Sequence, residues 1–167
     1  MNVLMLSSEA VPFCKSGGLA DVVGALSAAL HTLGVDVRVL LPLYGSIDTT
    51  HMTRTGLSCR VTVDGFAETI EFLTQTVRGV PYYFISHPAF TERKGIYGDT
   101  SFAPYEDNIQ RYTIEDKSAF GLCEALGWKP DVIHCHDWTS GFAPYLLKLS
   151  ASSFFKETKS VLTIHNL

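Results

Sequence analysis

Residues 13–30 read FCKSGGLADVVGALSAAL and directly follow a short apolar run within the N-terminal residues NVLMLSSE. The apolar run predicts a strand from Asn2 to Leu6, and apolar residues recur with helical spacing from Leu19 to Leu33. Gly34 follows at a position typical of a helix C-cap. Between the two elements lies the turn Lys15–Gly18, which contains a lysine, a serine and two glycines. A strand, a glycine-rich turn and a helix in this order predict the first unit of an α/β fold.

The rest of the chain continues this alternation of strands and helices. We expect strands at Val35 to Leu41, Asp131 to Cys135 and Ser160 to Ile164, helices at Glu106 to Leu126 and Ser140 to Ser150, and an ordered loop from His87 to Tyr105. Between Cys59 and Ile85 the pattern predicts a β meander with turns at Asp64-Gly65 and Arg78-Gly79. Strands separated by helices form a mostly parallel sheet with helices on both faces. The predicted fold is therefore α/β and Rossmann-like, with an inserted β meander.

Composition excludes several classes of protein. A chain of 167 residues favours about one domain, and 46% hydrophobic with 18% charged residues is typical of a globular chain. The net charge of −4 argues against a nucleic-acid partner. The sequence lacks an apolar run of membrane-spanning length and a signal peptide, so we expect no membrane partner. The four cysteines lie far apart without a CxxC pair, which favours reduced thiols in a cytoplasmic protein.

The glycine-rich turn has the features of an anion site. Backbone N–H groups at a helix start, together with the helix dipole, attract phosphate. Gly17 and Gly18 allow a ligand to approach the backbone, and Lys15 supplies an ammonium group. Asp21, one turn later, accepts hydrogen bonds from sugar hydroxyls or orients Lys15. The alternative is an ordinary turn with a solvated lysine, and spacing alone leaves both interpretations open. Neither GxGxxG nor GxxxxGK[ST] is present.

Unusual residues also follow two later strands of the predicted sheet. HCHDW (residues 134–138) follows the Asp131 strand, and His165-Asn166 follows the last strand. Ligands of open α/β sheets bind beyond the carboxyl ends of the strands, so we expect these residues to lie near the glycine-rich turn.

The HCHDW segment admits a metal site as an alternative. In an extended strand, however, His134 and His136 point to one side and Cys135 to the other, so the three converge poorly on one ion. We therefore predict no metal. We expect His134 to be packed at the strand end, His136 to be functional, and Trp138 to be a core aromatic residue.

Three segments together carry a resemblance to a known family. They are KSGGLADVVGALSAAL, GVDVRVLLPLYGSI and WKPDVIHCHDWTSGFAPYLL. The chain resembles the N-terminal domain of bacterial glycogen synthase and plant starch synthase, retaining glucosyltransferases of family GT5 with the GT-B fold. The resemblance implies that residues 1–167 form the N-terminal starch synthase catalytic domain, which is the N-terminal half of a GT-B fold.

The resemblance also implies an activity and roles for particular residues. The family transfers glucose from ADP-glucose to the non-reducing end of an α-1,4-glucan with retention, and no cofactor is implied. Lys15 and the amides of Gly17 and Gly18 are implied to contact the donor diphosphate. His136 is implied to lie beside the transferring glucose. Asp107, in the segment YEDNIQRY, matches an aspartate on the acceptor side of the cleft, where glycogen or another α-glucan binds.

The chain departs from the family pattern in two places. Glu115 and Asp116 stand where the family usually carries an apolar helix face, and we expect a local rearrangement or a solvent-facing turn there. The sequence stops at TIHNL, whereas the family continues into a second domain that grips the far side of the donor. We therefore expect a fragment that lacks the C-terminal domain, its partner in the cleft, and is inactive alone.

Two other functions compete with this interpretation. A non-catalytic module that binds glucan or a protein partner is the main alternative. An NAD-dependent dehydrogenase is weaker, because GxGxxG is missing and the second strand ends in Leu40-Leu41-Pro42 without an acidic residue. The sequence leaves open whether the donor base is adenine or uridine.

Overall fold

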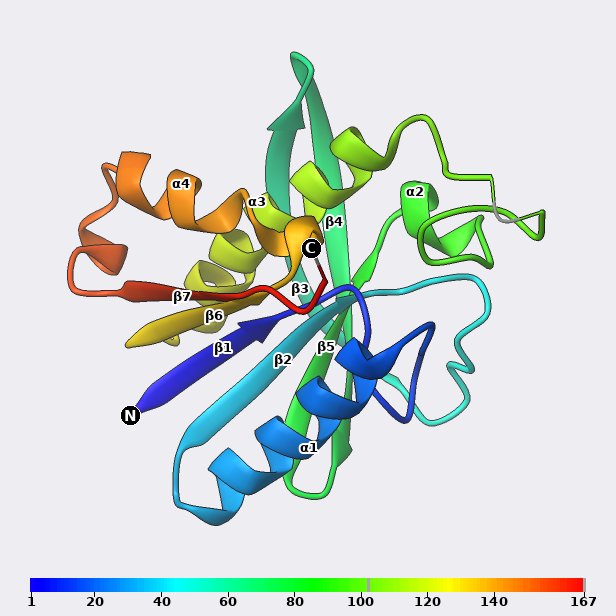
Figure 1. The fold of residues 1–167 in the computed structure, drawn as a ribbon. Coiled ribbons are helices and arrows are strands. Elements are labelled where there is room, and N and C mark those ends of the chain that lie inside the picture. Colours follow the sequence, from blue (N-terminus) through cyan, green and yellow to red (C-terminus); the bar gives the residue numbers. More distant parts are fainter. Residues whose placement is uncertain (102, 167) are drawn as a thin grey trace.

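A single twisted sheet forms the centre of the fold in this computed structural model, which describes residues 1–101 and 103–166 (Figure 1). Within those residues the sheet has seven strands in the order β3-β4-β5-β2-β1-β6-β7. The strands are β1 (Asn2–Leu6), β2 (Asp36–Pro42), β3 (Thr53–Val63), β4 (Phe66–Val77), β5 (Val80–Ser86), β6 (Val132–His136) and β7 (Lys159–Thr163). β5, β2, β1, β6 and β7 run parallel, and β3 and β4 extend the sheet as an antiparallel meander.

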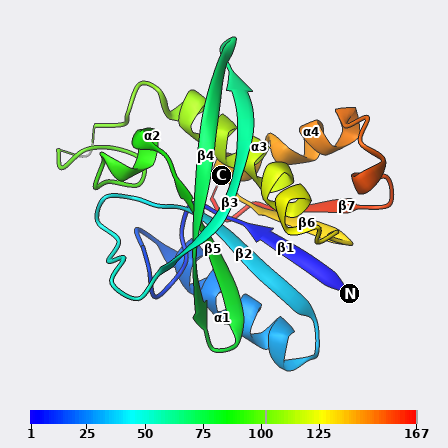
Figure 2. The ribbon, with the colours of Figure 1, turned by 180° about the vertical axis from the view of Figure 1, so that it is seen from behind.

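Helices cover both faces of this sheet. They are α1 (Gly18–Thr32), α2 (Pro88–Thr91), α3 (Asn108–Leu126) and α4 (Ala143–Leu149), with two 3-10 turns, η1 (Trp138–Ser140) and η2 (Ser153–Phe155). α1 packs against β2 and β5, whereas α3 packs against β3 and α4, and α4 packs against β6 and β7. The two opposite views in Figures 1 and 2 show α1 apart from α3 and α4. The predicted fold class, a mostly parallel sheet with helices on both faces and an inserted meander, is confirmed.

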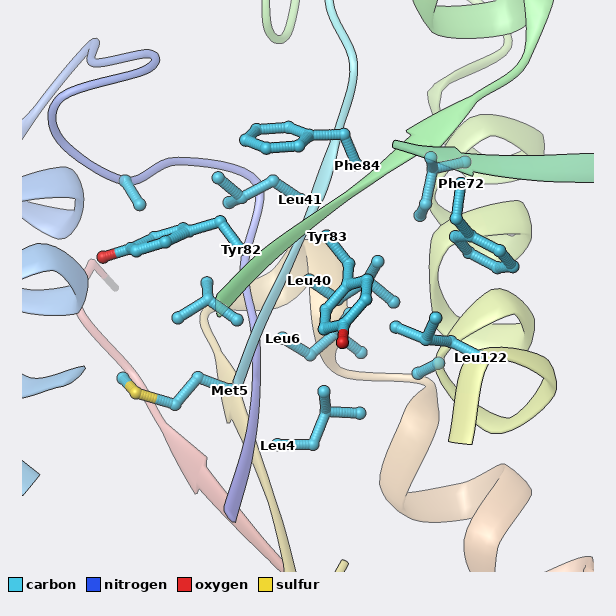
Figure 3. Close-up of a cluster of buried hydrophobic side chains, with 14 of the residues drawn as sticks. Leu4, Met5, Leu6, Leu40, Leu41, Phe72, Tyr82, Tyr83, Phe84 and Leu122 are labelled. Carbon is cyan, nitrogen blue, oxygen red and sulfur yellow. The ribbon is translucent and has the colours of Figure 1, made fainter. Parts of the chain in front are cut away.

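The core lies on both sides of the parallel strands because side chains alternate along a strand. Figure 3 shows Met5 and Tyr82 on the side of α1, and Leu4, Leu6 and Leu122 on the side of α3. All five are buried. Strands covered on both faces need apolar residues at successive positions, and this explains the unbroken run VLML after Asn2.

Local geometry confirms the predicted turns. Asp64, Gly65, Arg78 and Gly79 all have positive φ, as the tight connections of a meander require. Gly127 ends α3 in the left-handed conformation.

Some boundaries differ from the sequence prediction. β3 begins at Thr53 instead of Cys59, because its first residues are polar and alternate in exposure, which leaves little apolar signal. The segment predicted as a loop, His87 to Tyr105, contains the short helix α2, which begins with Pro88 at its first position. The helix predicted at Ser140 to Ser150 is shorter, because η1 precedes α4.

The expectation for Glu115 and Asp116 was wrong. Both lie in the middle of α3, which continues without a break, and their exposed fractions are 0% and 1%. The helix turns these positions toward the interior. Burial raises the pKa of Asp116 to about 8, so this carboxyl group is mostly neutral at pH 7, and burial raises the pKa of Glu115 well above its usual range.

Candidate functional site

A buried carboxylate organises the glycine-rich turn. Glu9, 2% exposed just after β1, accepts hydrogen bonds from the Ser16 and Gly17 amides, the latter at 3.1 Å. The Ser16 hydroxyl donates to the same carboxylate at 2.8 Å, and the Tyr97 hydroxyl donates at 2.5 Å. Part of the predicted anion site is therefore filled by the chain's own anion, and the first amide left for a ligand is that of Gly18.

Open space surrounds the two glycines. Gly17 is the N-cap of α1 in an extended conformation, and it has no side chain of its own that could cap the next amides of the helix. A Cβ placed on Gly17 or Gly18 would meet no heavy atom of the protein within 4 Å. The first N–H groups of a helix have no intrahelical partner. Amides and free space thus lie together at the end of β1.

Lys15 forms an ion pair with Asp21. Its Nζ lies 2.6 Å from Asp21 Oδ2, and the side chains are 50% and 56% exposed. The geometry fits the second role predicted for Asp21, the orientation of Lys15. An exposed pair of this kind contributes only about 0–1 kcal/mol, so an incoming anion competes easily for the ammonium group.

A pocket of about 600 Å³ opens beside Gly17 and Gly18. It is lined by residues that follow β1, β6 and β7, together with the start of α1 and Tyr97: Glu9, Ser16, Gly17, Gly18, Leu19, Val22, Tyr97, Asp137, Trp138, His165 and Asn166. The three sequence segments predicted to converge do converge here, as the parallel arrangement of their strands requires.

Trp138 was predicted in the core, and this was wrong. It is 57% exposed because it lies on η1, at the rim of the sheet, before α4 begins. Its ring meets Tyr112 edge-on at 5.2 Å and lies 5.9 Å from the ring of Tyr97. Two tyrosine rings thus pack against the indole, and Trp138 also lines the pocket.

Three imidazoles lie together where β6 and β7 end, and of these only His165 lines the pocket. His136 is fully buried, its Nδ1 lies 3.0 Å from Nε2 of His165, and its ring lies 4.1 Å from that of His134. Burial, with His134 and His165 nearby, lowers the pKa of His136 to about 3, so the ring is neutral. Its Nε2 has no hydrogen-bond partner among the described residues. His134 was predicted at the strand end, but it is the middle residue of β6 and half-buried, and its Nε2 lies 2.8 Å from the Thr163 hydroxyl.

These imidazoles do not form a metal centre. Among residues 1–101 and 103–166, no group of three or more His, Cys, Asp or Glu side chains has suitable geometry. Cys135, which stands between His134 and His136 in the sequence, is buried, and burial raises the pKa of its thiol.

Asp107 lies apart from this pocket. It is the N-cap residue of α3, and its carboxylate pairs with the Arg93 guanidinium. The hydrogen bond from Arg93 lowers the pKa of Asp107 below its usual value. Lys15 is also outside the lining of this pocket; it borders a neighbouring hollow of about 620 Å³ with Lys94 and Tyr97. The structure therefore brings Gly17 and Gly18 together with Asp137, Trp138 and His165, and leaves His136, Lys15 and Asp107 outside the lining of this pocket.

Sequence reasoning missed Glu9 and Tyr97. Their roles depend on contacts between segments 88 positions apart in the chain, which leave no local pattern. The only available signal was a carboxylate directly after a buried strand, where a charge needs partners.

Two further observations concern the chain as a whole. None of the helices in the described part of the chain has the length and apolarity to cross a membrane. All four cysteines, each within the described residues, are free.

Comparison with known sequences gives a consistent match along the chain. A family model described as starch synthase catalytic domain matches residues 2–167. The glycogen synthase of Photobacterium profundum is 40% identical over 170 residues, which cover 99% of this chain and 33% of that protein. Glycogen synthase 2 of Geobacter sulfurreducens is 40% identical over 173 residues, covering 100% of this chain and 35% of that protein. The chain spans about a third of the length of these curated relatives.

Solved structures agree with the sequence matches. The catalytic domain of starch synthase IV from Arabidopsis thaliana, bound to ADP and acarbose, has a TM-score of 0.86 and 31% identity, covering 99% of this chain and 34% of that chain. A sucrose-phosphate synthase from Thermosynechococcus elongatus has a TM-score of 0.60 at 13% identity over 99% of this chain and 33% of that one, which shows a shared fold alone.

Proposed function

The chain belongs to the starch synthase catalytic domain family, and from that premise we propose that it forms one wall of the active-site cleft of a glycogen synthase. The proposed reaction transfers glucose from ADP-glucose to the non-reducing end of an α-1,4-glucan with retention. Its proposed partners are ADP-glucose, glycogen or a related glucan, and the remainder of a longer protein. The proposed location is the cytoplasm, in keeping with the four free cysteines.

The space in front of Gly17 and Gly18 is the observation that carries this proposal. A Cβ would fit at either position, and neither residue has a positive φ. The chain's own conformation therefore does not require glycine there. A ligand that approaches the backbone at the N-terminus of α1 does require it, and a diphosphate is the ligand such a terminus favours.

In the proposed mechanism the diphosphate leaves with growing negative charge. Glu9 already occupies the Ser16 and Gly17 amides, so the phosphate accepts hydrogen bonds from the Gly18 amide and the helix start. The Lys15 ammonium group leaves Asp21 and binds the phosphate when the donor enters. Before that, the ion pair with Asp21 holds the Lys15 side chain near the site. Charged donors fixed where charge develops are each worth roughly 3–4 kcal/mol of the barrier.

The other side chains act on the sugars. His136 is fully buried and does not line the pocket, so its proposed place beside the transferring glucose rests on the family resemblance. The open face of Trp138 offers an apolar surface at the pocket rim. Asp107, held by Arg93, serves the acceptor side of the cleft, as the family resemblance implies.

The proposal is tested by Lys15→Ala in the protein that carries this chain, assayed by glucose transfer from labelled ADP-glucose to glycogen. We expect activity to fall by about two to three orders of magnitude, because a charge partner of the transition state is lost. Lys15→Arg is expected to restore it only in part, since a planar guanidinium replaces a point charge.

The control is Lys148→Ala, which removes an exposed lysine on α4 at a distance from the glycine-rich turn. We expect it to retain activity. A loss under tenfold for Lys15→Ala would contradict the diphosphate role. A module that only binds glucan would retain glycogen in a pull-down and transfer no glucose in any variant.

A further inference from the structure

Asp116 reaches from α3 to the beginning of α4, two helices that lie side by side (Figure 1). Its Oδ2 accepts a hydrogen bond from the Phe142 amide at 3.1 Å. Phe142 is the N-cap residue of α4, and its own side chain makes no capping bond. The carboxyl group, 1% exposed, therefore caps α4 from a neighbouring helix.

The segment that this bond holds is the loop of residues 137–142, which joins the end of β6 to α4. Its beginning is held by the Asp137 amide, which donates to the Thr163 carbonyl at 2.8 Å. Its middle is held by the Thr139 hydroxyl, which donates to the Ser8 hydroxyl at 3.1 Å. Its end is held by Asp116.

Helix α3 also holds the aromatic residue of this loop. Tyr112 lies one turn before Asp116 on the same face, four positions earlier in the helix. The Tyr112 ring meets Trp138 edge-on at 5.2 Å. Two successive turns of α3 thus set the position of Trp138 and of the backbone that follows it.

We propose that Asp116 is a positioning residue of the active site, which holds the 137–142 loop so that Trp138 and the end of β6 keep their places beside the pocket. The role of the loop in catalysis rests on the proposed function, whereas the positioning itself does not. Because burial raises the pKa of Asp116 to about 8, the group is neutral at pH 7 and acts through its acceptor oxygen. An asparagine offers the same acceptor without charge.

Glu115 provides a matched control. It adjoins Asp116, is equally buried, and neither of its carboxyl oxygens has a hydrogen-bond partner within the described residues. Replacing either residue by leucine removes one buried carboxyl group from α3. Only the replacement at Asp116 removes a contact with the loop.

The test uses ¹⁹F NMR of the 167-residue chain labelled with 5-fluorotryptophan. The sequence has two tryptophans, Trp128, which is buried, and Trp138, which is exposed, so two resonances are expected. Asp116→Leu should shift or broaden the Trp138 resonance and leave that of Trp128 in place. It should also lower the hydrogen-exchange protection of the Phe142 amide at least tenfold. Asp116→Asn and Glu115→Leu should leave the Trp138 resonance and Phe142 protection as in the parent chain.

The proposal is overturned if Asp116→Leu leaves Trp138 and Phe142 unchanged, or if Glu115→Leu alters them as much. Should Asp116→Leu fail to fold, Asp116→Asn still decides, because loss of Phe142 protection in that variant contradicts the acceptor role. In the protein that carries this chain, Asp116→Leu should lower kcat/KM for transfer at least tenfold, with Asp116→Asn within about twofold of the parent. Absence of transfer in the parent would instead refute the proposed function and leave the spectroscopic result standing.

Discussion

Glu115 and Asp116 are adjacent carboxyl groups in the interior, and each titrates far from its usual pH. Burial is the main cause for both, and Asp116 adds to the shift at Glu115. A folded-state pKa above the unfolded value means that the folded chain binds more protons. Such a group stabilises the fold at low pH, and this contribution is lost as the pH rises from the unfolded pKa to the folded pKa.

For Asp116 this window runs from about pH 4 to about pH 8. Across it we expect the free energy of unfolding of the chain to fall, relative to that of Asp116→Asn, by about 1.4 kcal/mol per pH unit. Urea denaturation of both proteins at pH 5, 6.5 and 8 measures this difference. A difference that stays constant with pH would show that Asp116 is not buried as a neutral acid.

At the scale of single elements, the glycines at the start of α1 have free space around them, whereas the glycine in its middle is tightly packed. A Cβ on Gly17 or Gly18 meets open space, whereas one on Gly24 would lie 2.5 Å from a Val11 methyl and 2.9 Å from the Val11 carbonyl oxygen. Glycine is therefore needed for packing at Gly24 and, in our proposal, for the ligand at the other two positions.

We expect Gly18→Ala to change the free energy of unfolding by less than about 0.5 kcal/mol while lowering transfer activity at least tenfold. Gly24→Ala should destabilise the fold by about 1–3 kcal/mol, because the overlap involves backbone. Thermal melts and the transfer assay, run on both variants, separate the two effects. Unchanged activity in Gly18→Ala would remove the main support for a ligand at this turn.

The elements themselves were largely predictable because their signals are local. The helical spacing of Leu19 to Leu33 and the apolar runs of β1, β2 and β6 each specify an element from neighbouring residues. The sequence also predicted α3, but it did not predict that Glu115 and Asp116 are buried, because charged residues on a helix normally face solvent. The position of Trp138 depended on where η1 gives way to α4, a boundary without a clear sequence signal.

At the scale of the whole molecule, the parallel order of β1, β6 and β7 explains why the site was predicted in part. Carboxyl ends of parallel strands share one edge, so the glycine-rich turn and the histidines had to meet. What the sequence could not show was which groups satisfy one another there. Glu9 binds the Gly17 amide, which was predicted to contact a ligand, whereas the contact between Lys15 and Asp21 was one of the two roles predicted for Asp21.

The length of the chain relative to its relatives predicts how tightly it binds ADP-glucose by itself. The relatives are about three times longer than this chain, and the proposed donor lies in a cleft shared with their remainder. Two or three charge-assisted hydrogen bonds of roughly 1.5–3 kcal/mol each must offset an association cost of at least about 4 kcal/mol. We expect the 167-residue chain to bind ADP-glucose with a Kd of about 1 mM or weaker. Calorimetry measures it, and a micromolar Kd would mean that the site is complete within this chain.

One residue of the 137–142 loop suggests that this protein is less stable than its own fold allows. Asp137 has φ of 65° and ψ of −172°, a backbone conformation that belongs almost solely to glycine and costs other residues about 1–3 kcal/mol. A single change, Asp137→Gly, should relieve that strain and raise the melting temperature. Asp137 lines the pocket beside Gly17 and Gly18. If Asp137→Gly has a higher melting temperature and transfers glucose more slowly, then Asp137 contributes to activity at the expense of the stability of the fold.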